Sequence, residues 1–192
     1  MRRYFYLIIA FMLLGAVPSV YPASKVAPTH IVTSQYFAVY GPAELDILLV
    51  LKKLNYDYFL QSENYFSPAL REPKQVLADT LDAIFQESSR ILGVHIYTFQ
   101  ATIEFLQDQE TMKVVIYKMT GINMEERAFY LDDTKTIYLS INDLTVGILG
   151  HEMAHAIISH YFGAPPPQNI QEILAGYVDY SLGKTVKTPV SP

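Results

Sequence analysis

The segment from Asn142 to Gly163 reads Asn-Asp-Leu-Thr-Val-Gly-Ile-Leu-Gly-His-Glu-Met-Ala-His-Ala-Ile-Ile-Ser-His-Tyr-Phe-Gly. It is mostly apolar around its whole circumference, which is typical of a helix buried at the centre of a domain. Asn142 is a good N-cap, and Gly163 is a residue that commonly follows a helix C-terminus. The segment therefore predicts a long central helix, around which the rest of the chain must pack.

This predicted helix contains the motif His151-Glu152-Met153-Ala154-His155, of the form His-Glu-x-x-His. Residues i and i+4 share one helix face about 6 Å apart, so both imidazoles can bind one Zn²⁺. The glutamate between them can take a proton from a metal-bound water. The motif predicts metal-assisted hydrolysis, most often of a peptide bond. The alternative is a pair of core histidines hydrogen-bonded to neighbours, with Glu152 in an ion pair.

Two histidines leave a zinc site one protein ligand short. The candidates are a downstream carboxylate and the three other histidines, His30, His95 and His160. His160 follows His155 by five residues, which turns it about 140° away from that ligand on the same helix. The downstream carboxylate is therefore the more promising third ligand.

That carboxylate is Glu172, seventeen residues after His155. It lies near the start of a second predicted helix, which follows the three prolines at 165–167 and is expected to end at Gly183. Apolar residues recur there at helical spacing, at positions 170, 173, 174, 177 and 178. The alternative is that Glu172 caps its own helix, because Asn169 and Glu172 have the spacing of a capping box.

The two motifs together resemble the thermolysin-like gluzincin metallopeptidases, and more closely the small bacterial proteins with a peptidase MA-like domain. The second motif of those proteins resembles Glu-Gly-x-Ala-Glu-Tyr, and here it reads Glu172-Ile173-Leu174-Ala175-Gly176-Tyr177. The resemblance implies that His151, His155 and Glu172 bind zinc and that Glu152 is the general base.

The chain departs from that family at two positions. Thermolysin-like members often carry an aspartate four residues after the third ligand, where it orients a ligand histidine, and this chain has Gly176 there. Asp179, on the same helical face as Glu172, is the possible substitute. The glycine usual directly after the glutamate is Ile173.

The remaining elements are predicted from hydrophobic periodicity and turn residues. They are a strand at 31–40, a helix at 43–54, a loop or frayed continuation at 55–71, a helix at 73–92, a strand at 95–106, a helix at 107–120 and a hairpin of 128–131 with 136–140. This order predicts an α+β, zincin-like domain, with a small mixed β-sheet packed on helices, an active-site helix and a C-terminal ligand helix.

Two further expectations concern the surroundings of the active-site helix. The strand at 136–140 is the candidate edge strand, which would take an extended peptide by strand addition. Gly147 and Gly150 are expected to let the helix lie close to the sheet.

The N-terminus predicts an exported protein. Arg2-Arg3 precedes a nearly unbroken apolar run at 4–17 and a small-residue exit, the pattern of a signal peptide over residues 1–23. Cleavage after Ser19 or Ala23 fits this pattern, and the alternative is an uncleaved anchor that tethers the protein to a membrane. A single domain is expected at 24–183, followed by a disordered tail at 184–192.

Composition excludes several classes of function. The chain has no cysteine, so it has neither disulfides nor a thiolate zinc site. A net charge of −5 argues against a protein that binds nucleic acid, which would need a basic surface.

The leading hypothesis is an exported (secreted or periplasmic) zinc metallopeptidase acting on a peptide or protein substrate. The alternatives are a catalytically inactive zincin-fold binding domain in the cell envelope and an amidase acting on cell-wall peptides.

Overall fold

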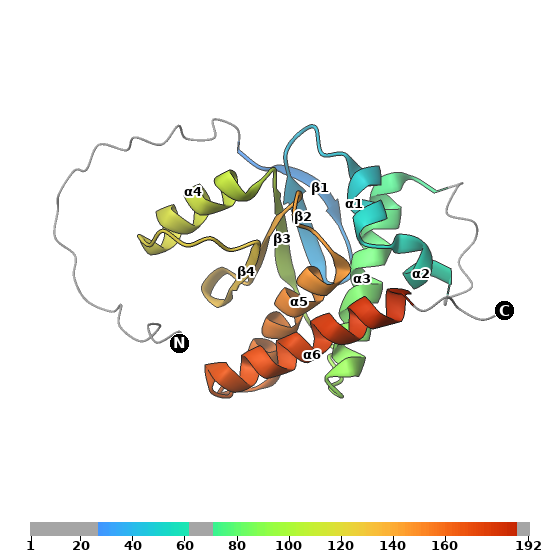
Figure 1. Ribbon diagram of the computed structural model, residues 1–192. Helices are drawn as coiled ribbons and strands as arrows, with labels where there is room; N and C mark the ends of the chain where they lie inside the picture. The colour runs from blue at the N-terminus through green and yellow to red at the C-terminus, as the bar shows by residue number, and fades with distance from the viewer. Residues whose placement is uncertain (1–26, 62–70, 188–192) are drawn as a thin grey trace.

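The protein is an α+β structure built on one five-stranded mixed sheet (Figure 1). The computed structural model describes residues 27–61 and 71–187, so the predicted signal peptide lies outside the described residues. The strands are β1 Thr29–Thr33, β2 Phe37–Gly41, β3 Ala101–Leu106, β4 Ala128–Leu131 and β5 Thr136–Ser140. Their order is β1-β2-β3-β5-β4. The three inner strands run parallel, and the two edge strands are antiparallel to their neighbours.

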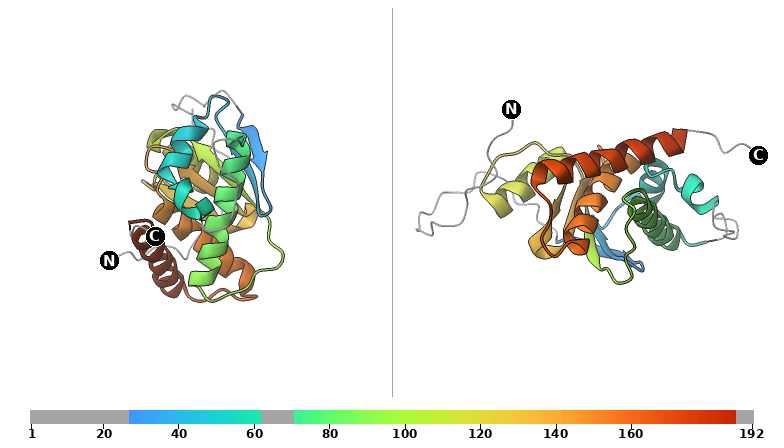
Figure 2. Two further views of the ribbon diagram at one scale, coloured as in Figure 1. Left: turned by 90° about the vertical axis from the view of Figure 1, so that its right-hand side faces the viewer. Right: turned by 90° about the horizontal axis from the view of Figure 1, so that it is seen from below.

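Helices cover the two sides of this sheet unequally (Figure 2). They are α1 Ile47–Lys53, α2 Tyr56–Gln61, α3 Pro73–Ile91, α4 Gln109–Thr120, α5 Val146–Tyr161 and α6 Gln168–Lys187. The main core lies between the sheet and α1, α3 and α5, and α6 packs along α5 on its outer side. On the opposite face α4 forms a smaller cluster with β3 and β5. No helix within residues 27–61 and 71–187 is both long and apolar enough to cross a membrane.

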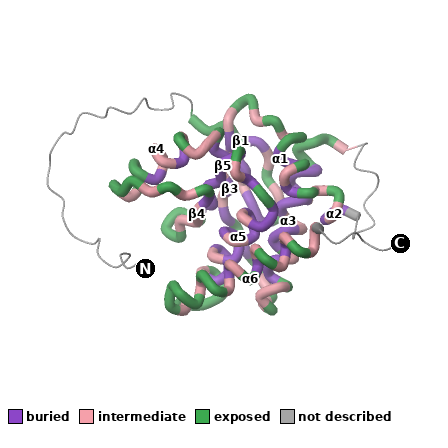
Figure 3. The backbone as a smooth tube through the Cα atoms, in the orientation of Figure 1, coloured by how far each residue is buried: buried purple, intermediate pink, exposed green. Residues whose placement is uncertain are grey.

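The core is made by alternate residues of the parallel strands. Val39, Ile103 and Ile137 are completely buried and lie side by side on β2, β3 and β5, because side chains of a strand alternate between faces. They face α3 and α5, whose buried residues include Leu81 and Met153. Figure 3 shows the buried positions concentrated on the strands and α5.

Several predicted elements are confirmed. Helix α3 begins at Pro73, whose missing N–H costs nothing in the first turn. Helix α4 ends at Gly121, which adopts the left-handed conformation (φ 70°) that favours glycine. The hairpin of 128–131 with 136–140 forms as β4 and β5, joined by the short 3₁₀ turn Asp132–Thr134. In each case the deciding interactions are between near neighbours in the sequence.

The single strand predicted at 31–40 is wrong, because the segment folds into the antiparallel pair β1 and β2. The turn between them is held by Asp82 of α3. Its carboxylate accepts hydrogen bonds from the Ser34 hydroxyl at 2.6 Å and the Gln35 amide at 2.9 Å. A side chain almost fifty residues away thus bends a segment whose composition alone favours one continuous strand.

The expected edge strand is also wrong. Strand β5 (136–140) pairs with β3 on one side and β4 on the other, and all five of its residues are buried. The edge beside α5 is β4 instead. The pairing with β3, which is distant in the sequence, places β5 inside the sheet.

Three predictions about the ends and contacts of α5 and α6 need correction. The N-cap of α5 is Thr145 rather than Asn142, since its hydroxyl accepts the Ile148 amide at 3.2 Å. Gly147 and Gly150 face α6 and not the sheet. Helix α6 continues through Gly183 to Lys187, so the tail expected from residue 184 is helical over its first four residues.

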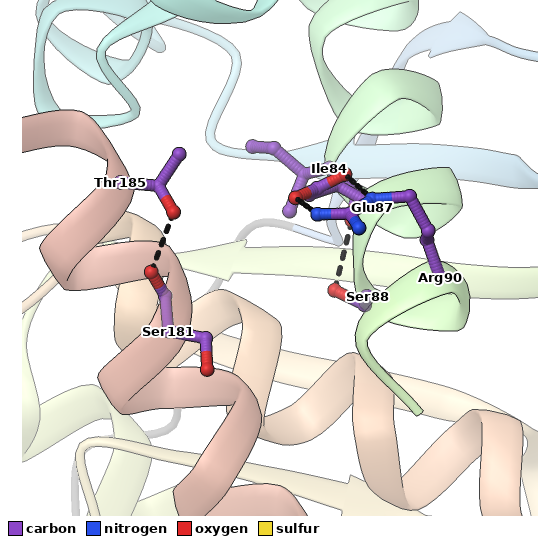
Figure 4. Close-up of polar contacts among 6 residues, drawn as sticks. All are labelled: Ile84, Glu87, Ser88, Arg90, Ser181 and Thr185. Atoms are coloured by element: carbon purple, nitrogen blue, oxygen red, sulfur yellow. Dashed lines mark hydrogen bonds and ion pairs between the residues drawn. The ribbon is translucent and has the colours of Figure 1, made fainter. Parts of the chain in front are cut away.

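Helix α6 also reaches α3, and the hydroxyl groups near this approach are satisfied within their own helices (Figure 4). Ser88 donates to the Ile84 carbonyl and Thr185 to the Ser181 carbonyl, both at 2.8 Å. These groups therefore need no partner from the other helix.

Candidate metal centre

His151 and His155 lie on one face of α5, as their spacing predicts. Their Nε2 atoms are 3.2 Å apart, and the ring centroids are 5.0 Å apart. Both side chains are only partly buried, which leaves the nitrogens accessible at the surface between α5 and α6.

Glu172 of α6 completes the group. Its carboxylate oxygens lie 3.6 Å from Nε2 of His151 and 3.7 Å from Nε2 of His155. Donor atoms bound at about 2.1 Å to a tetrahedral metal are about 3.4 Å apart. The two Nε2 atoms, 3.2 Å apart, are close to this spacing, and each lies 3.6–3.7 Å from a different oxygen of the Glu172 carboxylate. Taking one donor atom from each residue, the group lies within 4.8 Å, so His151, His155 and Glu172 could hold a metal ion.

Glu172 does not cap its helix. The first turn of α6 is closed by the Pro167 carbonyl, which accepts the amides of Ile170 at 2.8 Å and Gln171 at 3.1 Å. Pro167 is therefore the N-cap, and Asn169 is already inside the helix. The capping-box reading of Asn169 and Glu172 is wrong, and the side chain of Glu172 is turned towards α5 instead.

The close contact of α5 and α6 positions Glu172 opposite the histidines. A Cβ atom at Gly147 would overlap the carboxylate of Asp179, and one at Gly150 would overlap the side chain of Leu182. The absence of both Cβ atoms allows the two helices to pack closely. Ala175, Val178 and Leu182 are fully buried in this contact.

Gln171 is a contributor that the sequence analysis missed. Its Nε2 donates to the Pro166 carbonyl at 2.8 Å, and its side chain also forms a hydrogen bond with His155. It thereby joins a histidine of the group to the proline-rich loop before α6. Its position in the sequence could have identified it. Gln171 lies four residues before Ala175, on the buried side of the helix, where an amide without a hydrogen-bond partner would be costly.

The pKa of His155 is lowered, first by burial and then by the neighbouring His151. The charge of Glu172 and the hydrogen bond of Gln171 act in the opposite direction. A lowered pKa keeps the imidazole neutral at neutral pH, which is the form that binds metal.

Glu152 is buried beside the group, with 8% of its surface exposed. Burial raises the pKa of Glu152 to about 8, and the charges of Glu172 and Glu126 act in the same direction. The backbone amide of Tyr130 on β4 donates to it and lowers the pKa in part. The side chain of Glu152 thus extends from α5 to the edge strand β4. Its raised pKa allows this carboxyl group to gain or lose a proton near neutral pH.

The other histidines lie elsewhere. His160 packs edge-on against Phe99, with ring centroids 5.2 Å apart, and His30 is hydrogen-bonded to Thr33 at 2.9 Å. His95 is exposed on the loop before β3. Within the described ranges, the only group of histidine and acidic side chains with metal-binding geometry is His151, His155 and Glu172.

Asp179 was the possible substitute for the missing aspartate at Gly176. Its carboxylate lies against Gly147, one helical turn before His151. Within the described chain it makes no hydrogen bond or ion pair with that histidine. Asp179 therefore packs near the base of the site without directly orienting a ligand.

Comparison with known proteins found no matching family model, curated protein or solved structure. The assignment of this centre therefore rests on the residues and geometry of this chain.

Proposed function

We propose that this protein is an exported zinc-dependent metallopeptidase of the gluzincin type with a zincin-like fold. Zinc would be held by His151, His155 and Glu172, and Glu152 would be the general base. The observation that carries the proposal is the convergence of His151, His155 and Glu172, whose donor atoms, one from each residue, lie within 4.8 Å of one another. Two imidazoles and one carboxylate, with a fourth position open to solvent, are the donor set of a catalytic zinc site.

The buried Glu152 supports a hydrolytic reaction. Zinc, when bound, polarises a scissile carbonyl and acidifies a water molecule. Glu152 would accept the proton of that water and pass it to the leaving nitrogen. Its pKa near 8 in the metal-free protein suits a group that must both gain and lose a proton, and a neighbouring cation would favour its ionised form.

The edge strand β4 is the proposed docking site for an extended peptide. It carries the Tyr130 amide that contacts Glu152, and its outer side has no partner strand in the described sheet. A peptide that added to this edge would lie next to the general base. Strand β4 takes over the role that the sequence assigned to 136–140.

The test is the substitution Glu152→Gln, with metal content and hydrolysis of an unfolded protein measured on the same sample. We expect the variant to keep stoichiometric zinc and to lose hydrolysis by several orders of magnitude. Loss of zinc together with activity would mean that Glu152 is a ligand or a structural residue.

A second candidate is a catalytically inactive binding domain of the cell envelope. It is favoured by Gly176 in place of the usual aspartate and by the lack of a hydrogen bond between Asp179 and His151. A parent protein that binds zinc but cleaves neither unfolded proteins nor cell-wall peptides would support it.

A further inference from the structure

The sheet face opposite α5 carries an organised row of side chains. His30, Tyr40, Glu104, Tyr138 and Phe129 lie directly opposite one another on five neighbouring strands. A bulge in β1 between His30 and Val32 keeps His30 on the same face as Thr33, to which it is hydrogen-bonded. Helix α4 covers only one end of this face, at Leu106 and Tyr138.

The rings in this row contact one another in pairs. Phe129 stacks on Tyr138, with centroids 4.8 Å apart and planes inclined by 15°. At the other end His30 meets Tyr40 edge-on, with centroids 5.4 Å apart. Glu104 occupies the gap between the two pairs, opposite both Tyr40 and Tyr138.

Glu104 has no side-chain partner in the part of the chain that the structure describes. It is half-buried, and within residues 27–61 and 71–187 it forms no hydrogen bond or ion pair. Burial raises the pKa of Glu104, and it also raises the pKa of Tyr138, to which the charge of Glu104 adds. A carboxylate among aromatic rings carries a desolvation cost that a bound cation would offset.

A hollow of about 290 Å³ lies next to this row, at the adjacent row of residues towards the start of the parallel strands. Thr33, Ala38 and Thr102 line it and form the adjacent cross-strand row on the same face. Lys135 also lines the hollow, but no ion pair joins it to Glu104 in the described structure.

We propose that this face binds an organic cation, the guanidinium or ammonium group of a basic side chain, at Glu104 between Tyr40 and Tyr138. The carboxylate provides charge-assisted hydrogen bonds, and the exposed part of Tyr40 provides a ring face for a cation. The site lies on the opposite side of the sheet from α5 and does not depend on the metal centre.

The test uses the full chain labelled with ¹⁵N and two probes, Nα-acetyl-arginine methylamide and its uncharged analogue Nα-acetyl-citrulline methylamide. We expect the arginine probe to shift the amide signals of Tyr40, Glu104 and Tyr138, and the citrulline probe to bind at least about tenfold more weakly. Equal binding of the two probes would overturn the proposal. So would the absence of any shift up to about 50 mM, well above the millimolar range of weak specific binding.

Variants locate the site. Glu104→Gln preserves shape and should weaken arginine binding at least about tenfold, whereas Glu44→Gln, the same change at an exposed loop position, should leave it unchanged. Tyr40→Phe keeps the ring and should still bind, and Tyr40→Leu should bind more weakly. Undiminished binding by Glu104→Gln, or shifts centred on Glu172 and Asp179, would place the cation elsewhere and reject the proposal.

Discussion

Gly150 of α5 lies so close to Leu182 of α6 that a Cβ atom at position 150 would overlap the leucine side chain. The distance between these helices determines how far Glu172 lies from His151 and His155. A glycine that has no chemical role thus controls the geometry of the candidate metal centre.

The substitution Gly150→Ala should therefore lower stability and metal affinity together. We expect a loss of about 1–3 kcal/mol in the free energy of unfolding, because Leu182 must shift in a packed contact. Denaturant unfolding and zinc titration measure the two effects. The control is Gly176→Ala on α6, where a Cβ would meet nothing within 4 Å, and which should be neutral or slightly stabilising. Equal effects of the two substitutions would contradict the packing argument.

Removal of a donor should abolish tight zinc binding. We expect His151→Ala, His155→Ala and Glu172→Ala each to weaken zinc binding by more than about 100-fold, since even indirect changes at such sites cost about 10–100-fold. Isothermal titration with ZnCl₂ measures this loss. The control His160→Ala should keep its zinc, because His160 packs against Phe99. Retention of full affinity by Glu172→Ala would remove it from the ligand set.

Gln171 should contribute to zinc affinity through its hydrogen bond to His155. We expect Gln171→Leu to reduce zinc affinity about 10–100-fold, because it removes the hydrogen bond to His155 and the bond to the Pro166 carbonyl. Asn169→Ala, a change of an exposed residue in the same turn, is the control and should leave affinity unchanged. An unchanged zinc affinity of Gln171→Leu would show that the histidine needs no such support.

Glu152 should make the stability of the metal-free protein depend on pH. Its folded pKa of about 8 lies above the ordinary value of 4.5, so the protonated folded state is favoured. This contribution is complete below about pH 4.5 and is lost as the pH rises through about 8, by at most about 1.4 kcal/mol per pH unit. Unfolding in the presence of a chelator measures this slope. Glu152→Gln should flatten it, and an identical slope in both proteins would rule out Glu152 as its source.

We expect the predicted signal peptide over residues 1–23 to be removed if the protein is exported as proposed. Mass spectrometry of the exported protein should find a new N-terminus between about Val20 and Val26. Intact Met1 in a membrane fraction would mean instead that the apolar run at 4–17 is an anchor.

The sequence by itself determined the parts that depend on near neighbours. The i, i+4 spacing of His151 and His155 places them on one helix face wherever that helix lies. Pro73 at the start of α3 and Gly121 after α4 act through the backbone of their own helix. The strand and turn residues of 128–140 likewise predict the β4–β5 hairpin, but they do not show which of its two strands forms the edge of the sheet.

Only the tertiary structure decided how these parts meet. The interior place of β5 depends on pairing with β3, some thirty residues away, and the β1–β2 turn depends on Asp82. The position of Glu172 depends on Gly147 and Gly150 facing α6, which their spacing in α5 does not reveal. A sequence pattern within one helix or strand determines which of its faces is apolar. It does not determine which distant segment packs against that face, because this depends on how all the elements fit together.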